Sequence, residues 1–264
     1  MLNTQIHSEW TTFRTGRPPT APTLWNRGKG LFAILVLGIL MAGNATALAA
    51  TVSWIGTIGD WNTPANWSTG ALPGATDDVT IDAGGSQTVT CASGAHNISS
   101  VQCQEDFVLS GGSLTIANAT QFAASFSQSS GVLSGSGDVT LSGAFTWTSG
   151  MMGGTGRTII PFAGTATLIG GGTKGLDGSR VFENRGTVTW TGGAIDLNAG
   201  STGGSGRIEN AAGGLFGIQT DNAISATGFA DLNTPAPRLN NPGTLGKSAG
   251  AGTTTSRCLL STRA

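Results

Sequence analysis

Short runs of alternating apolar and polar residues recur along most of this chain, and nearly every gap between them contains Gly, Ser or Asn. Alternation over a few positions, bounded by turn residues, is typical of short β-strands. No long stretch after position 50 keeps a helical period. The pattern therefore predicts an all-β protein, with strands at 79–81, 88–90, 113–116, 138–141, 144–148, 157–160, 165–169, 187–190 and 215–219.

One motif occurs twice and sets the architecture. The segments LSGSGDVTLSGAFTWTSG (133–150) and LDGSRVFENRGTVTWTGG (176–193) align without a gap at an offset of 43 residues. A repeated unit stacks on its own copies because it cannot bury its apolar side alone, whereas a sandwich or barrel has no reason to return the same string. At roughly 20 to 25 residues per coil, 43 residues are two coils, and the chain after position 50 makes about eight or nine coils of a parallel β-helix, a β-solenoid.

A looser repeat places Asn just before a Gly turn and a following β-former. It occurs at Asn184, Asn210 and Asn241. An Asn side chain can bond backbone groups at a corner, and Asn side chains from successive coils can stack as a ladder. This structural role is favoured here over a role as sugar ligand, which the sequence leaves open.

Composition narrows the possible partners. Charged residues are 10% of the chain and 43 of its 264 residues are Gly, against roughly 25% charged residues in an ordinary globular protein. From position 51 there are nine Lys and Arg and 13 Asp and Glu, a net charge near −4 without basic clusters. This balance argues against a nucleic-acid partner. Regularly placed β-branched and aromatic residues argue against disorder.

The chain begins with a segment typical of secretory signal peptides. A mildly basic stretch precedes an apolar run at 31–42 and an Ala-x-Ala site at 47–49. The alternative, a membrane anchor, needs about 20 apolar residues. We therefore predict export with cleavage, a secreted or cell-surface location and no membrane span in the mature chain. The predicted organisation is a signal peptide (1–50), an N-terminal cap with the first strands (51–83), β-helix repeats (84–255) and a non-repeat tail (256–264).

The tail breaks the repeat pattern. It reads SRCLLSTRA, contains Cys258, and has neither a turn signal nor strand alternation. We read it as a sign that the C-terminus is truncated and that the solenoid stops within a coil. An uncapped end exposes an apolar face and a sheet edge, which predicts poor solubility or end-to-end self-association.

Five Trp residues are candidates for either structure or glycan binding. Trp54, Trp61 and Trp67 lie within 14 residues at the start of the predicted solenoid, where a cap must close the first coil. Stacking of a sugar on these rings is the alternative. Trp147 and Trp190 lie one repeat apart and are read as a stacked structural pair. Were both to face outward, they would form a stripe able to bind polysaccharide.

The remaining candidates for chemistry are few. Cys91 and Cys103 have a spacing along the chain that lets them meet on adjacent coils. Export permits a disulfide between them, and two buried thiols are the alternative. The densest carboxylates, at positions 77, 78 and 82, match no calcium-loop spacing, so no metal or cofactor is predicted. Position 78 is read as a turn residue at the start of a strand.

Enzymatic chemistry has little support in the residue pattern. His96 is the single His after position 50, the chain has no Tyr, and no local nucleophile, zinc or phosphate-binding motif is present. Arg157 and Arg207 follow matching Gly-rich strings and read as surface residues of the repeat. A polysaccharide lyase or hydrolase would need paired carboxylates in a groove. We therefore expect no catalytic residues and a non-enzymatic protein.

The opening of the predicted solenoid resembles a known kind of protein. It contains Trp54-x-Gly-x-x-Gly-x-Trp61, then Asn-Trp67-Ser, Pro-Gly and Asp-Asp-Val-Thr-Ile. These strings, with the later Trp-Thr-Gly-Gly and Asn-x-Gly-Thr strings, are similar to secreted bacterial glycine-rich β-helix repeat proteins of the adhesin or autotransporter-passenger kind. The resemblance covers about residues 52–255 and implies a right-handed parallel β-helix in an extracellular or cell-surface setting. It carries no catalytic residues.

Three functions follow as expectations. The first is a structural or adhesive element of the cell surface, with a surface polysaccharide or an envelope component as partner. The second is a carbohydrate-binding module, if Trp147 and Trp190 face outward on one side. The third is a polysaccharide-cleaving enzyme, if two carboxylates converge beside an Arg.

Overall fold

A computed structural model describes residues 50–200, 204–227, 236–257 and 259–261 of the chain. The predicted signal peptide and Cys258 lie outside the described residues. Within them, the regular structure is all β-strand except for one short 3-10 helix, η1 (Pro64–Asn66). This part of the chain contains no helix with the length and apolar character needed to cross a membrane.

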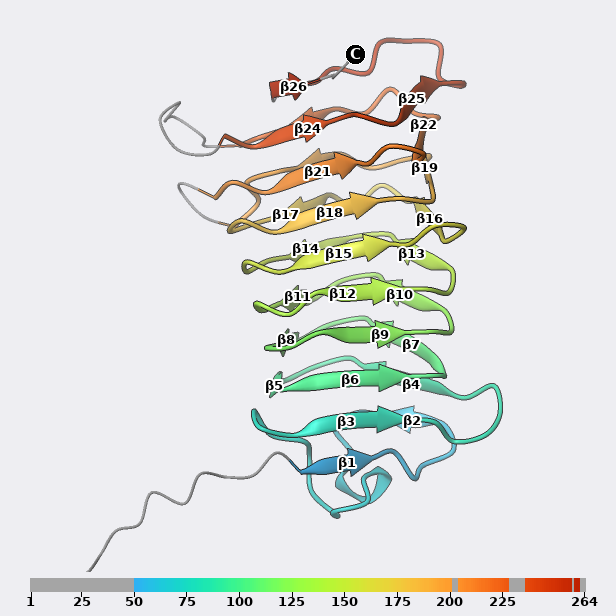
Figure 1. The fold of residues 1–264 in the computed structure, drawn as a ribbon, viewed down its shortest axis with the longest axis vertical. Coiled ribbons are helices and arrows are strands. Elements are labelled where there is room, and N and C mark those ends of the chain that lie inside the picture. The colour runs from blue at the N-terminus through green and yellow to red at the C-terminus, as the bar shows by residue number, and fades with distance from the viewer. Residues whose placement is uncertain (1–49, 201–203, 228–235, 258, 262–264) are drawn as a thin grey trace, which may run out of the picture. The chain divides into compact units, whose positions relative to one another are not determined.

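The strands form three parallel sheets that run the length of the stack (Figure 1). Sheet 1 contains β1 (Thr51–Ser53), β3 (Asp78–Ile81), β6 (Ser100–Cys103), β9 (Thr120–Phe122), β12 (Val139–Leu141), β15 (Arg157–Ile160), β18 (Val181–Asn184), β21 (Arg207–Asn210), β24 (Arg238–Asn240) and β26 (Leu259–Ser261). Sheet 2 contains β2 (Gly59–Asp60), β4 (Thr88–Cys91), β7 (Asp106–Leu109), β10 (Phe126–Gln128), β13 (Phe145–Trp147), β16 (Thr165–Leu168), β19 (Thr187–Trp190), β22 (Leu215–Ile218) and β25 (Thr244–Lys247). Sheet 3 contains β5 (Ala95–Ile98), β8 (Ser113–Ile116), β11 (Val132–Ser134), β14 (Gly150–Met152), β17 (Lys174–Leu176), β20 (Ile195–Asp196) and β23 (Ile224–Ser225).

Each full coil contributes one strand to every sheet, so the fold is the predicted parallel β-solenoid, with about eight turns. In Figure 1 the strands of sheet 1 run from left to right along the front, and the chain returns along the back to a higher level. This winding is right-handed, as the resemblance implied.

The strand register explains the repeat in the sequence. Thr140 is in register with Ile159 on the next coil, and Ile159 is in register with Glu183 on the coil after that. These two coils together give the 43-residue offset, so the prediction that the repeat spans two coils is confirmed. Later coils are longer, and Glu209 and its partner Asn240 are farther apart in the sequence than either earlier pair. The insertions lie between strands, where an added loop leaves the register of the sheets intact.

The interior consists of columns of like side chains, because strand alternation turns every second residue inward. One column in sheet 2 contains neighbouring aromatic rings, of which Phe107 and Phe126 are stacked and Phe145 is tilted. The Phe107 and Phe126 ring centroids are 5.5 Å apart, and those of Phe126 and Phe145 are 5.8 Å apart. The whole column contains Val89, Phe107, Phe126, Phe145, Ala166, Val188, Phe216 and Leu245.

A buried ladder of asparagine side chains runs along the corner after β18, β21 and β24, as the sequence predicts. Asn184 donates from Nδ2 to Oδ1 of Asn210 at 2.8 Å, and Asn210 donates in the same way to Asn241 at 2.5 Å. The Nδ2 groups of Asn184 and Asn210 also reach the carbonyl oxygens of Leu215 and Thr244, both at 3.0 Å. The amides therefore satisfy backbone groups at the corner where the chain leaves sheet 1.

We expect the Asn210→Leu variant to lose about 2–4 kcal/mol of unfolding free energy. The change keeps the volume but leaves buried polar partners on both neighbouring coils without a bond, at about 1–3 kcal/mol for each unsatisfied group. Urea unfolding measures the loss. Asn118→Leu is the control. Asn118 is exposed in the corner between β8 and β9, and its side chain donates one hydrogen bond, to Ser99 Oγ on the preceding coil at 2.9 Å. Equal losses in the two variants would contradict the role of the ladder.

Glycine allows the corners of successive coils to touch. Gly135 has a φ of 116°, and a Cβ at this position would lie 2.0 Å from the carbonyl oxygen of Ile116 on the coil below. Gly154, one coil above, has a φ of 84° and would place its Cβ 2.3 Å from the Gly135 oxygen. The high glycine content thus follows from backbones that meet at these corners without an intervening side chain.

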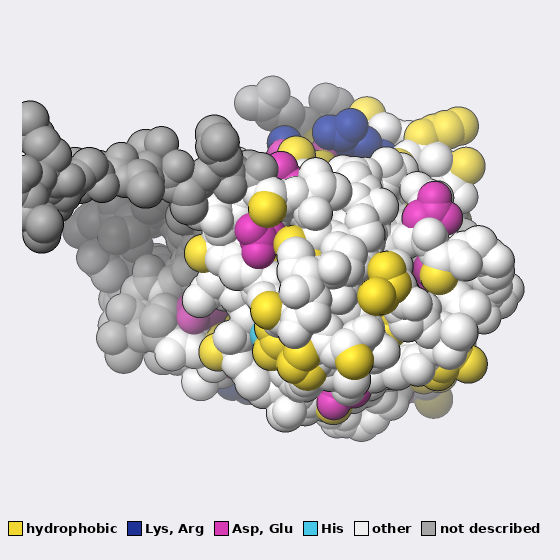
Figure 2. Space-filling view, turned by 90° about the horizontal axis from the view of Figure 1, so that it is seen from below, with side chains coloured by type: hydrophobic (Ala, Val, Ile, Leu, Met, Phe, Trp, Pro, Cys, Tyr) yellow, Lys and Arg dark blue, Asp and Glu magenta, His cyan; other side chains and the backbone are white. Residues whose placement is uncertain are grey.

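An aromatic cluster closes the N-terminal end. Trp54, Trp61 and Trp67 are all buried. The Trp67 ring lies edge-on to both others, with centroids 5.0 Å from Trp54 and 4.7 Å from Trp61, and its Nε1 donates to the Trp61 carbonyl oxygen at 2.8 Å. Figure 2 views this end and shows apolar side chains as separate groups among polar ones. The rings are packed against one another and are not spread as a platform for a sugar.

The C-terminal tail differs from its prediction. The sequence predicts no strand after position 255, yet β26 pairs in parallel with β24, and Ser256 forms a bridge with Ile224. A parallel ladder requires backbone groups and not an alternating side-chain pattern, which explains why the side-chain sequence did not reveal it. A cavity of about 290 Å³ remains at this end. Its apolar lining includes Ile218, Ile224, Leu239, Leu245 and Leu260.

Candidate functional site

The outward positions of the sheets decide what the solenoid can bind. On sheet 1 one outward column through the first coils is uncharged, with Thr80, Gln102, Gln121 and Thr140 in register. Ionisable side chains of sheet 1 concentrate instead on the later coils, from β15 to β24. Sheet 3 has a different feature, a shallow trough. These two surfaces are the candidate sites.

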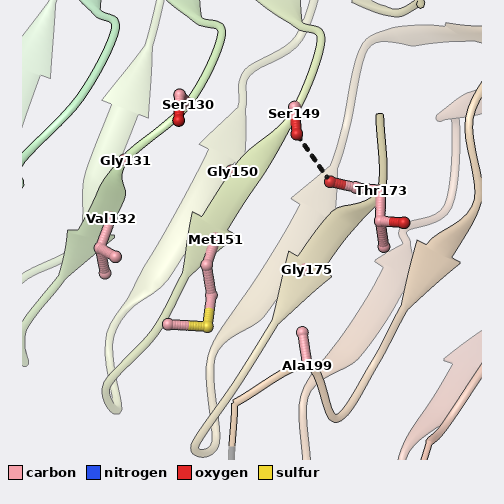
Figure 3. Close-up of a pocket in the computed structure, with 9 residues that line it drawn as sticks. All are labelled: Ser130, Gly131, Val132, Ser149, Gly150, Met151, Thr173, Gly175 and Ala199. Carbon is pink, nitrogen blue, oxygen red and sulfur yellow. Dashed lines mark hydrogen bonds between the residues drawn. The ribbon is translucent and has the colours of Figure 1, made fainter. Parts of the chain in front are cut away.

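The trough lies across β11, β14 and β17 (Figure 3). Val132 and Met151 are neighbours in register, and Gly175 continues the row without a side chain. The cavity has a volume of about 400 Å³. Its lining comprises Ser130, Gly131, Val132, Ser149, Gly150, Met151, Thr173, Gly175 and Ala199.

The chemistry of the trough is neutral. Ser149 donates from Oγ to the Thr173 carbonyl oxygen at 3.3 Å, and the Met151 side chain extends over the floor. Ala199 borders the trough beside Gly175. A Cβ added at Gly175 would lie 2.5 Å from the Ala199 Cβ, so a side chain at position 175 would collide with it. Apolar surface beside hydroxyl groups suits a ligand that has an apolar face and polar edges, such as a sugar ring.

The charged surface on sheet 1 is built around Glu183. This residue is buried, and its carboxylate pairs with Arg157 from the preceding coil and with Arg185, which directly follows the same strand. Arg185 is exposed and Arg157 is partly exposed. Two guanidinium groups therefore neutralise one acid, and this part of the surface is internally paired.

The next two coils carry a second pair of arginines. Arg207 on β21 is in register with Arg238 on β24, and both are partly exposed. The nearby acid Glu209 accepts a hydrogen bond from Asn240 Nδ2 at 2.7 Å. Among the residues that the structure describes, neither guanidinium forms an ion pair or a side-chain hydrogen bond. The sequence singled out Arg207 as a surface residue but had no means of placing Arg238 beside it.

Two further cations are fully buried and donate hydrogen bonds to carbonyl and hydroxyl oxygens, most of them on neighbouring coils. Lys174 Nζ donates to the carbonyl oxygens of Gly192 at 2.9 Å, and of Thr148 and Gly172 at 3.2 Å. Arg180 donates to Thr158 Oγ1 from Nη2 at 2.9 Å and from Nε at 3.1 Å. Burial lowers the pKa of Lys174 to about 8 and that of Arg180 to about 10. Sequence reasoning missed both, because neither position breaks the strand pattern.

We expect the unfolding free energy to rise with pH above about pH 8. Lys174 has a lowered pKa in the fold, so the unfolded chain binds a proton in this range that the folded chain does not, and stability increases by at most about 1.4 kcal/mol per pH unit. Above about pH 9 the ionisation of unfolded thiols opposes the rise. Urea midpoints across this range measure the trend. Lys174→Met removes the rise, and an unchanged slope in that variant would contradict the assignment.

The structure turns Trp147 and Trp190 inward. Both are buried, with Leu168 of the intervening coil between them in register. Trp190 Nε1 donates to the Gly193 carbonyl oxygen at 2.8 Å. Strand alternation places these positions on the inner face, so no ring face is available to a sugar, and a glycan-binding stripe made of these residues does not exist. The two rings are part of one core column.

The two described cysteines are buried free thiols. Cys91 belongs to β4 in sheet 2 and Cys103 to β6 in sheet 1, and the Cys103 sulfur donates to the Glu105 carbonyl oxygen at 3.1 Å. Burial raises the pKa of Cys91 to about 11 and that of Cys103 to about 12. The structure thus shows the second of the two sequence interpretations, buried thiols without a bridge.

Two acidic residues near the first coil accept hydrogen bonds, one within a turn and one between neighbouring strands. Asp78 accepts from Ser100 Oγ at 2.6 Å, and this hydrogen bond is the main cause of its lowered pKa. Asp77 accepts from the Gly74 backbone N–H at 2.8 Å. In the described ranges, no three His, Cys, Asp or Glu side chains converge as a metal site. His96 Nε2 lies 2.9 Å from the Ser93 carbonyl oxygen.

Fold and surface together define a class: a parallel β-solenoid with an aromatic N-terminal cluster, a polar interior ladder and arginines gathered on one face. Comparison of this chain with protein families, with curated proteins and with solved structures finds no match.

Proposed function

We propose that this chain is a non-enzymatic structural or adhesive element of the cell surface. The observation that supports this proposal is that its buried cationic and amide side chains form hydrogen bonds inside the fold. Lys174, Arg180 and Asn210 are buried and bond to backbone or hydroxyl groups of other coils. Such side chains hold a rod together, and they are not arranged to meet a substrate.

The outer surface supports the same function. Much of it consists of hydroxyl and amide side chains in register, as on the first coils of sheet 1. These groups can form many weak hydrogen bonds to a hydroxylated surface, and a rod repeats them at about 4.8 Å per coil. The N-terminal sequence, with its basic stretch, apolar run and Ala-x-Ala site, is typical of a secretory signal peptide and supports a surface location.

The test separates adhesion from cleavage. The purified chain is incubated with a panel of polysaccharides and with bacterial envelope preparations, and both retention of the protein and release of new sugar ends are measured. We expect retention without cleavage. Cleavage that disappears in Glu183→Gln would overturn the proposal in favour of a polysaccharide-active enzyme. Absence of retention on every surface would leave only a scaffolding role and would remove adhesion.

The trough favours a second candidate function, binding of a neutral glycan. Its hydroxyl groups and the Met151 side chain offer both kinds of contact that a sugar ring makes. We expect Met151→Glu to abolish retention on neutral polysaccharide, because it places a charge over the apolar floor. Ser127→Glu, an outward change on sheet 2, is the matched control. Retention that is equal in both variants would exclude the trough as the binding site.

A further inference from the structure

Arg207 and Arg238 are two like charges on neighbouring coils, and neither forms an ion pair with another described residue. The two residues occupy adjacent parallel strands in direct register, so their backbones are about 4.8 Å apart. Like charges placed opposite each other on neighbouring strands repel and destabilise a sheet. The cost is reduced when an anion lies between them.

Two acids lie on this surface. Glu183 pairs with Arg157 and Arg185, while Glu209 accepts from Asn240. Within the described part of the chain, Arg207 and Arg238 have no carboxylate within ion-pair distance. Guanidinium groups bind carboxylate, sulfate and phosphate oxygens through paired N–H donors, with more geometric specificity than an ammonium group. The surface therefore has donors of the type that recognises oxyanions.

We propose that Arg207 and Arg238 form a binding site for an acidic polysaccharide, whose negatively charged groups bridge the two coils. The choice of a polysaccharide rests on the adhesive function proposed above. The chain of sugars would follow the stack, with its acidic groups on the arginines and hydroxyl groups on Asn240.

The neighbouring charges favour a polysaccharide over a nucleic acid. Glu209 lies on the same strand as Arg207, two residues away on the same outward face. Its carboxylate would repel a backbone that carries one phosphate per residue. A polymer whose acidic groups are spaced among neutral hydroxyl groups avoids this repulsion. The net charge near −4 after position 50 acts in the same direction.

The experiment measures the affinity of the purified full chain for polygalacturonate, dextran sulfate, neutral dextran and double-stranded DNA at low and moderate salt. We expect binding to both acidic polysaccharides that weakens as salt increases, and weaker binding to dextran and DNA. The double variant Arg207→Gln, Arg238→Gln should lower the affinity for the acidic polysaccharides at least tenfold. Circular dichroism and the unfolding midpoint check that the variant remains folded.

A matched double variant controls for net charge. Lys247, on β25 of sheet 2, pairs with Asp221, and Arg257 is exposed near the C-terminal end of the described chain, so Lys247→Gln, Arg257→Gln changes the charge equally but should lower the affinity less than twofold. Equal losses in both variants, or DNA binding as tight as polygalacturonate binding, would overturn the proposal. Retention on envelope material without affinity for acidic polysaccharide would overturn this site while leaving the adhesive function standing.

Discussion

Replacing Trp67 with Ala should lower the unfolding free energy by about 3–5 kcal/mol, the range for truncating a buried aromatic side chain. Trp67 connects the other two rings of the N-terminal cluster, Trp54 and Trp61. It contacts Trp54 and Trp61 edge-on, forms a backbone bridge with Trp54, and donates to the Trp61 carbonyl oxygen. Its loss opens a cavity beneath the first coil and exposes the adjacent core to water.

Chemical denaturation with tryptophan fluorescence and circular dichroism as separate probes measures this effect. Ile58→Ala is the matched control, since Ile58 belongs to the same end but is 71% exposed, and it should change stability by less than about 0.5 kcal/mol. A solenoid unfolds by loss of neighbouring coils, so we also expect Trp67→Ala to broaden the transition. A Trp67→Ala protein as stable as the control would show that the aromatic cluster is not a cap.

Gly135→Ala should be comparably damaging, with an expected loss of about 2–5 kcal/mol. Gly135 has a φ of 116°, and an added Cβ would lie 2.0 Å from the Ile116 carbonyl oxygen. The left-handed backbone alone costs about 1–2 kcal/mol for an L residue, and forced displacement of packed backbone adds about 1–3 kcal/mol. The neighbouring coil must move, because the contacted atom is backbone and not a flexible side chain.

Gly171→Ala provides the comparison for this effect. Gly171 lies in a bend between β16 and β17, its φ is outside the left-handed range, and a Cβ there meets nothing within 4 Å. Alanine at this position should be neutral or slightly stabilising, since it restricts the unfolded chain. Thermal unfolding of the two variants decides the point. Comparable midpoints would mean that the close approach at Gly135 relaxes without cost.

Much of the fold was predictable because local pattern determines it. Alternation gave strands in their correct places, and the 43-residue repeat gave the spacing of two coils. The Asn184, Asn210 and Asn241 corners were visible because the role of Asn before a Gly turn is local. The strand at Leu259–Ser261 was not, since parallel pairing there depends on the backbone of the preceding coil and not on a side-chain period.

The candidate sites were much less predictable. The outward stripe of Trp147 and Trp190 was a reasonable alternative, yet both rings are inside. A shift of one residue in strand register reverses which face a side chain occupies, and sequence alone left that register open. The trough on sheet 3 depends on Gly175 lying between Met151 and Ala199, a relation that only stacking of the coils creates.

The sequence by itself determined that this protein is a stack of short strands with glycine corners, an apolar interior and few charges, because those properties follow from residue type and period along the chain. The tertiary structure decided which residues meet on the surface. Arg207 and Arg238 are separated by a longer coil than the one that joins Thr140 to Ile159, and loop insertions of unequal length erase the period that would have aligned them. Their juxtaposition exists only because parallel pairing restores the register after each insertion.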